Sequence, residues 1–127
     1  MQLNLETPDY DYVMRGADGA SALVNERRLA ASFILAPRAL VEDWPVRDAA
    51  SLQPADLDPL LALEPELVLL GTGGRQAFPP AATMAACLGR GIGLEAMTNA
   101  AAARTFNVLA SEGRRVVAGF IMDPPGD

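Results

Sequence analysis

Residues 67–74 read Leu-Val-Leu-Leu-Gly-Thr-Gly-Gly, and this stretch decides the fold. An uninterrupted apolar run is typical of a strand that is buried on both faces of a parallel sheet. The residues that follow, Gly71, Thr72, Gly73 and Gly74, predict a tight turn at the carboxyl end of that strand. In open α/β sheets, turns at this position present backbone N–H groups on which ligands bind.

The chain after this turn predicts a helix, a strand, a second helix and a closing strand. Pro79-Pro80 opens the first helix, whose apolar stripe is predicted at Ala81, Met84, Ala85 and Leu88. A strand follows over 92–97, and Thr98 or Asn99 caps the second helix. Its apolar face is predicted at Ala102, Phe106, Leu109 and Ala110. Gly113 ends this helix in the left-handed conformation, and the last strand covers 116–122.

The first half of the chain predicts strands instead. Residues 10–14 alternate with period two and lead into a turn at 16–19, and 40–44 form a further short extended segment. Segments 22–24 and 32–35 flank the polar reversal 25–28, which indicates a hairpin. Trp44 is interpreted as a core or domain-edge anchor, in preference to a stacking platform. A linker over 46–66 holds one short helix, with Asp58 as its N-cap and Pro59 at its first position.

Strands followed by alternating strand and helix predict the α/β class. We expect one domain over 1–127, with three layers: a central mixed β-sheet, helices packed on it and an extra N-terminal β layer. Residues 1–9 and 123–127 are expected to be loose termini.

Composition excludes several functional classes. The chain of 127 residues has a net charge of −6, no histidine, no lysine and one cysteine. A P-loop, a Cys/His zinc site, a Schiff base and a serine–histidine triad are therefore excluded, and we expect no cofactor, metal or catalytic residue. The acidic charge disfavours nucleic acid. The Arg114-Arg115 pair and the acids Glu64 and Glu66 are interpreted as solvated surface.

The lone cysteine and the chain's hydropathy suggest a compartment. Cys87 lies in an apolar helical pattern, is interpreted as a buried thiol, and can form no disulfide within the chain. No run approaches the ~18 apolar residues that a membrane helix requires, and the first residues do not resemble a signal peptide. We expect a cytoplasmic protein without membrane insertion.

The glycine turn matches part of a dinucleotide-binding motif. Gly71 and Gly73 fit the first two glycines of G-x-G-x-x-G, but Gln76 occupies the third position and the helix begins late. Glu95 lies near the end of the next strand, where such sites place an acid. The more favoured interpretation is a structural turn beside a modest cleft.

Glu95 and Arg104 are the charged residues of greatest interest. Glu95 interrupts an apolar strand, and Arg104 lies in the second turn of the following helix, where small alanines leave its guanidinium room to reach Glu95. An ion pair is favoured, and binding of a ligand is the alternative. The residues predicted to bind a ligand or partner are Gly71, Thr72, Gly73, Gly74, Arg75, Glu95, Thr98, Asn99 and Arg104.

Three stretches, 69–73, 91–97 and 103–116, carry a resemblance to a known family. The chain resembles the Mth-domain proteins of unknown function, whose eukaryotic relatives include complex I assembly factor 3. The resemblance covers nearly the whole chain and implies a three-layer α/β domain with no established reaction. Family members commonly carry a cysteine and a tyrosine where this chain has Ala103 and Phe106, so chemistry that requires a thiol or phenol there is unsupported.

Two functions remain open at this point. The favoured one is a non-enzymatic interaction or assembly factor with a protein partner; a homodimer through an exposed N-terminal edge strand is compatible with it. The alternative is a small-molecule or nucleotide binder, or an enzyme without a known motif. Either would use a cleft between 71–75 and 95–104.

Overall fold

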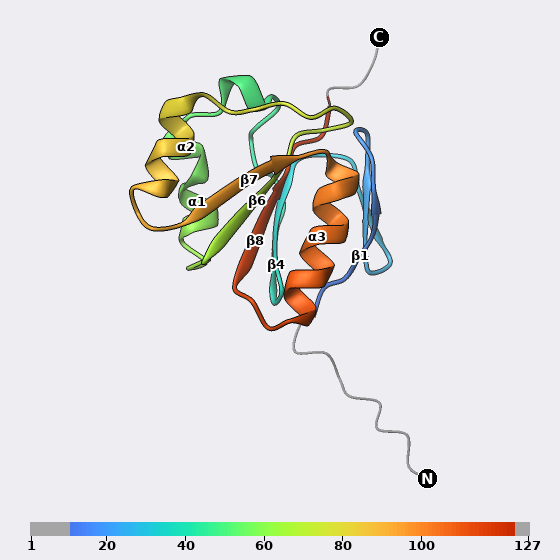
Figure 1. Cartoon of the computed structure of the whole chain (residues 1–127). Helices are drawn as coiled ribbons and strands as arrows, with labels where there is room; N and C mark the ends of the chain where they lie inside the picture. Colours follow the sequence, from blue (N-terminus) through green and yellow to red (C-terminus); the bar gives the residue numbers. More distant parts are fainter. Residues whose placement is uncertain (1–10, 124–127) are drawn as a thin grey trace.

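The computed structural model describes residues 11–123, which form a central sheet covered on both faces (Figure 1). The sheet has five strands in the order β5-β4-β8-β6-β7. Strand β6 is parallel to both β7 and β8, whereas β4 is antiparallel to β8 and to β5. The predicted mixed sheet is therefore confirmed. Its strands are β4 (Phe33–Ala36), β5 (Ala39–Val41), β6 (Leu67–Gly71), β7 (Gly93–Met97) and β8 (Val116–Phe120).

The N-terminal strands form a second sheet of three antiparallel strands in the order β1-β2-β3. This sheet and α3 contribute to the same hydrophobic core, and together they cover one face of the central sheet. The predicted extra N-terminal β layer is therefore confirmed. The three strands are β1 (Met14–Ala17), β2 (Ala22–Val24) and β3 (Arg27–Leu29).

Helices supply the remaining cover of the central sheet. Helix α3 packs against β6, β8 and β1, while α1 and α2 lie across the other face (Figure 1). Two short 3₁₀ turns precede α1 within the linker. The bounds are η1 (Ala49–Ser51), η2 (Pro54–Leu57), α1 (Asp58–Leu61), α2 (Ala81–Leu88) and α3 (Asn99–Ser111). Thr98 caps α3, since its Oγ1 accepts from the Ala101 N–H at 3.2 Å.

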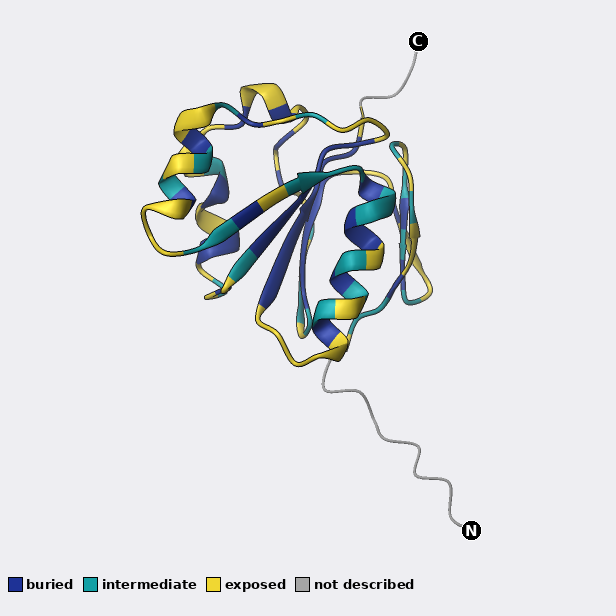
Figure 2. Cartoon of the chain, in the orientation of Figure 1, coloured by how far each residue is buried: buried dark blue, intermediate teal, exposed yellow. Residues whose placement is uncertain are grey.

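The central strands β6 and β8 are buried on both sides, as the apolar run predicts (Figure 2). On the α3 side, Phe33 of β4 and Phe120 of β8 stack with ring centroids 4.9 Å apart. Both side chains are fully buried, and each such burial stabilises the fold by about 1.5–3 kcal/mol.

Trp44 anchors the opposite core, which confirms its predicted role. It is 4% exposed, and its Nε1–H donates to the Asp56 carbonyl oxygen at 3.0 Å. Its ring lies against Gly119 of β8, where an added Cβ would lie 2.7 Å from two ring carbons. The glycine in the middle of this buried strand is therefore required by the close approach of the tryptophan.

Three predictions in the N-terminal half are wrong. Strand β1 begins at Met14 and continues through Gly16 and Ala17, which the sequence placed in the turn. The turn begins only at Asp18, whose N–H donates to the Ser21 carbonyl oxygen. The hairpin closes on β3, because only Asn25 and Glu26 form the reversal, with Asn25 at φ 53°. Residues 33–36 pair in the central sheet instead. The helix at 58 has Leu57 as its N-cap, since η2 runs directly into α1.

The predicted face of α2 is also wrong. Its buried residues are Thr83 and Cys87, whereas Leu88 is 62% exposed. The Thr83 hydroxyl donates to the Leu52 carbonyl oxygen at 2.6 Å, which turns this side of the helix toward the linker. Alanines lie all round the helix, so the apolar pattern does not distinguish the two faces.

Candidate functional site

The glycine turn lies beside the carboxyl end of β7, as the sequence predicts. The parallel register pairs Gly71 with Met97, and the Thr72 N–H donates to the Met97 carbonyl oxygen at 2.9 Å. Asn99, the first residue of α3, then donates its N–H to the Gly73 carbonyl oxygen at 2.9 Å. The turn and the start of α3 are thus joined at one edge of the sheet.

The side chain of Asn99 fixes this junction. It is fully buried, and its Oδ1 accepts from the Gly73 N–H at 3.1 Å. Its Nδ2 donates to the carbonyl oxygens of Asp18 and Ile121, both at 3.0 Å. A Cβ at Gly71 would collide with Asn99 Oδ1, so the first glycine of the turn makes room for this amide.

Asp123 holds the outer part of the turn. Its Oδ2 accepts from the Gly74 N–H at 3.3 Å, and its own N–H donates to the Gly19 carbonyl oxygen at 2.7 Å. The expectation that residue 123 belongs to a loose tail is therefore wrong; residues 1–9 and 124–127 lie outside the described residues. The Gly73 and Gly74 N–H groups, which a phosphate would need, are bonded to side chains of the protein itself.

The loop after the turn, residues 74–78, is held by side-chain hydrogen bonds. Thr72 Oγ1 donates to the Arg75 carbonyl oxygen at 2.7 Å and accepts from the Ala77 N–H at 3.1 Å. Gln76 Nε2 donates to the Ala96 carbonyl oxygen of β7 at 3.2 Å. This arrangement, here called the 74–78 loop, leaves Arg75 exposed and Phe78 62% exposed. Sequence reasoning treated these residues only as a delay before the helix.

The favoured ion pair between Glu95 and Arg104 is not formed. Both side chains are exposed, and neither takes part in an ion pair within residues 11–123. Arg104 shares a helix face with Ala100 and Asn107 and lines a hollow of about 250 Å³ between α3 and β1. Asn107 bonds both backbone groups of Met14 on that side, and the hollow that Arg104 lines lies against β1.

A second hollow lies at the opposite end of the parallel strands, where the sequence predicted no site. Its volume is about 510 Å³, and it opens between the end of α3, the start of β8 and the β4–β5 turn. Arg38, Arg114 and Arg115 surround an apolar floor, and we call this site the arginine hollow. The floor includes the half-buried Pro37, Ala39 and Leu63 and, beneath them, the buried Ala36, Ala110, Val116 and Val117. The Arg114-Arg115 pair alone does not indicate this hollow, because Arg38 is distant from the pair in the sequence.

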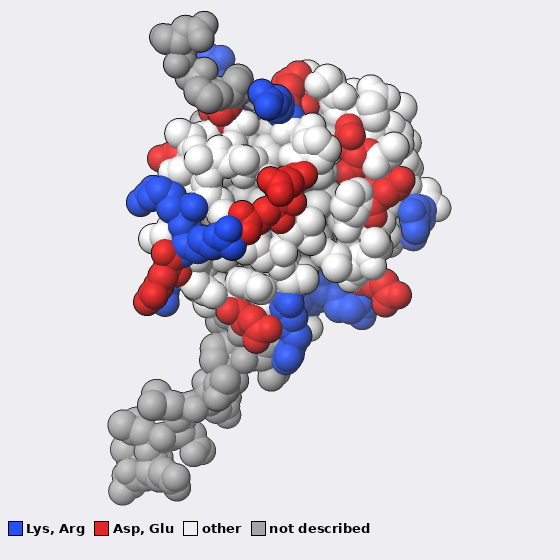
Figure 3. All heavy atoms as spheres, turned by 180° about the vertical axis from the view of Figure 1, so that it is seen from behind, with Lys and Arg blue, Asp and Glu red and all other residues white. Residues whose placement is uncertain are grey.

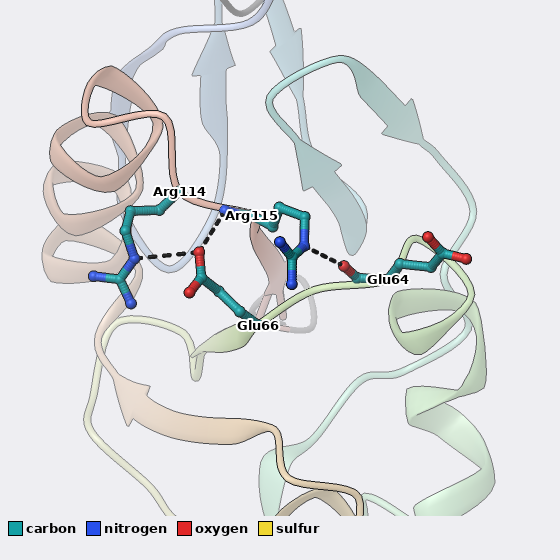
Figure 4. Close-up of polar contacts among 4 residues, drawn as sticks. All are labelled: Glu64, Glu66, Arg114 and Arg115. Carbon is teal, nitrogen blue, oxygen red and sulfur yellow. Dashed lines mark hydrogen bonds and ion pairs between the residues drawn. The ribbon is translucent and has the colours of Figure 1, made fainter.

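Two glutamates fix part of this arginine cluster (Figure 4). Glu66 Oε1 accepts from the Arg115 N–H at 2.9 Å and forms an ion pair with Arg114 Nε at 3.3 Å. The Arg115 N–H, and then the Arg114 guanidinium, hold the pKa of Glu66 below its usual value. Arg115 Nε donates to the Glu64 carbonyl oxygen at 3.3 Å, while the Glu64 carboxylate points away.

Other ligand classes find little support in the described part of the chain. Residues 11–123 contain no group of three potential Cys, His, Asp or Glu metal ligands. Acidic and basic side chains are mixed over the face shown in Figure 3, with no broad basic patch on that face. Over the same range, the helices are too short to cross a bilayer.

Comparison with known proteins gives one family and several relatives. A model of the family described as "Protein of unknown function (DUF498/DUF598)" matches residues 14–121. The human NADH dehydrogenase [ubiquinone] 1 alpha subcomplex assembly factor 3 is 31% identical over 106 residues, which are 82% of this chain and 56% of that protein. The 13 kDa major membrane protein of Francisella tularensis subsp. holarctica is 34% identical over 71 residues, 56% of this chain and 58% of that protein.

The chain thus spans little more than half the length of these curated relatives. Two solved structures match it more fully. An NMR structure from Xanthomonas campestris is 61% identical with a TM-score of 0.85, covering 100% of this chain and 96% of that one. A Mth938-like domain from Bordetella pertussis is 31% identical with a TM-score of 0.77, covering 99% and 95%. The resemblance to Mth-domain proteins is confirmed.

Proposed function

Since the chain belongs to the DUF498/DUF598 family of proteins of unknown function, we propose that it is a non-enzymatic factor that binds a partner protein during assembly of a larger complex. The name of its human relative, an assembly factor, supports this proposal. We also propose that the protein resides in the cytoplasm, because a chain with one cysteine can form no internal disulfide bond.

The partner surface in this proposal is the 74–78 loop with its surroundings. The observation that carries it is the exposure of Phe78, 62%, on a loop whose backbone is bonded by the Thr72 hydroxyl and whose Gln76 side chain is bonded to β7. Phenylalanine and arginine are enriched at protein–protein interfaces, and Arg75 lies three residues before Phe78. A loop that is already ordered loses little conformational entropy when a partner binds.

The remaining predicted residues have different parts in this proposal. Thr72, Gly73 and Asn99 hold the loop from below through their hydrogen bonds, and Thr98 caps α3 behind them. Binding of a nucleotide at the same turn is less well supported, because its phosphate would have to displace Asn99 and Asp123 from the Gly73 and Gly74 N–H groups.

A photo-crosslinking experiment tests the proposed surface. The photoreactive amino acid p-benzoylphenylalanine replaces Phe78 in one variant and Leu88 in a matched control, since both side chains are 62% exposed. We expect irradiation of cells to give one discrete product of higher mass from position 78 and none of that mass from position 88. Equal products from both positions, or none from position 78, would contradict the proposal. A product of twice the chain's mass would identify a homodimer instead.

A further inference from the structure

We propose that the arginine hollow binds a small amphipathic carboxylate, with the acid group on Arg38 and Arg115 and the apolar part against the floor. This site is separate from the 74–78 loop and lies at the other end of the parallel strands. A volume of about 510 Å³ falls within the range typical of small-molecule sites, roughly 300–1,000 Å³.

The three arginines differ in whether a carboxylate neutralises their charge. Arg114 has Glu66 as its ion-pair partner at 3.3 Å. Within residues 11–123, Arg38 and Arg115 take part in no ion pair, and the hydrogen bond that Arg115 donates from its side chain comes from Nε. The outer nitrogens of these two guanidinium groups are the donors that would hold a carboxylate, which suits their planar geometry.

The end of α3 does not oppose an anion here as an open helix terminus would. Its last carbonyl groups are closed by the chain itself: the Gly113 N–H donates to Ala110 O and the Arg114 N–H to Leu109 O, both at 3.0 Å. Gly113 has φ 75°, as this capping motif requires. These hydrogen bonds lower the partial negative charge that the helix end presents to the hollow, and the guanidinium groups of Arg114 and Arg115 add positive charge beside it.

The floor of the hollow explains why a purely polar anion is not expected. Pro37 and Ala39 at the β4–β5 turn are half-buried and present apolar surface to the hollow, while the buried Val116, Val117 and Ala110 close its base. Leu63 lines the same space from the segment that follows α1. Contact with these groups removes apolar ligand surface from water, worth about 0.8 kcal/mol per methylene group.

Titration of the purified chain with decanoate tests the site. Decanol, which lacks the charge, and acetate, which lacks the long alkyl chain, are the comparison probes. NMR chemical shifts and calorimetry are measured below the micelle concentration. We expect saturable decanoate binding that moves the amide signals of Arg115 and Val116, and at least about tenfold weaker binding in Arg38→Gln and Arg115→Gln. Both arginines are exposed, so these variants retain the fold.

Arg90→Gln is the matched control, because Arg90 is an exposed arginine outside the hollow; its decanoate affinity should equal that of the wild type. The proposal is overturned if decanoate fails to bind, if decanol binds as tightly, or if Arg38→Gln and Arg115→Gln bind as the wild type does. None of these results bears on the crosslinking at position 78.

Discussion

Asn99 and Gly73 bond to one another in both directions: the Asn99 N–H donates to the Gly73 carbonyl oxygen at 2.9 Å, and the Gly73 N–H donates to Asn99 Oδ1 at 3.1 Å. The pair joins the end of β6 to the start of α3. Because the amide of Asn99 also reaches Asp18 and Ile121, one buried side chain connects four segments of the chain. The 74–78 loop begins directly from this junction.

Replacement of Asn99 should destabilise the fold strongly. Asn99→Ala leaves the buried Gly73 N–H and Ile121 carbonyl group without partners and removes the part-buried bond to the Asp18 carbonyl group. Each buried loss costs about 1–3 kcal/mol, so we expect a total of roughly 3 kcal/mol or more. Urea unfolding measures this change. Ser111→Ala, on the exposed end of the same helix, is the control and should change stability by at most about 0.5 kcal/mol. A loss below about 1 kcal/mol for Asn99→Ala would show that the junction is unimportant.

Gly119→Ala should be far more disruptive than Gly16→Ala. A methyl group at 119 would lie 2.7 Å from the Trp44 ring in a packed core, whereas an added Cβ at 16 has no neighbour within 4 Å. Overpacking of this kind costs about 1–3 kcal/mol or more. Thermal unfolding of the two variants separates them. Equal melting temperatures would mean that Trp44 moves aside without cost.

The acid sensitivity of the fold should depend on Glu66. Its pKa is lowered in the folded state, first by the Arg115 N–H and then by Arg114, so the unfolded chain binds a proton more readily. The stabilisation is therefore complete above the ordinary pKa of 4.5 and is lost as the pH falls through the lower folded value.

Unfolding of the wild type and of Glu66→Gln should be compared from pH 6 to pH 3. We expect a difference in stability that is constant at the upper end and shrinks toward pH 3. Arg114→Gln should reduce this pH dependence only in part, because the larger cause, the Arg115 N–H, remains. A difference that does not vary with pH would contradict the assignment.

Cys87 should be inert in the folded protein. It is fully buried on the inner face of α2, and burial raises the pKa of its thiol. The reactive form is the thiolate, so a disulfide reagent such as Ellman's reagent should label it only when urea unfolds the chain. Rapid stoichiometric labelling without denaturant would show that α2 detaches from the sheet under native conditions.

The sequence predicts the central sheet well, because its signals are local. The apolar run Leu67–Leu70 and the helix ends at Thr98 and Gly113 depend on neighbouring residues, and the structure confirms all three. The face of α2 was predicted wrongly because it depends on a hydrogen bond from Thr83 to Leu52, which lies 31 residues away.

The candidate site was predictable only in outline. The glycine turn and Asn99 lie together because they follow two neighbouring parallel strands, and the sequence predicts both strands and the turns after them. The partners that fix the turn, Asp18 and Asp123, come from the two ends of the described chain, 81 and 49 residues from the groups they bond. The arginine hollow likewise combines Arg38 with Arg115 through the antiparallel pairing of β4 and β8.

The proposed partner surface is tested most directly by quantitative co-purification at native expression levels. The wild type is compared with Phe78→Ser and with Leu88→Ser, after urea unfolding has shown that both variants are folded. If the 74–78 loop binds the partner, Phe78→Ser should recover at least about tenfold less of it, as loss of a dominant contact implies, while Leu88→Ser matches the wild type. Equal recovery with all three proteins would contradict the proposal.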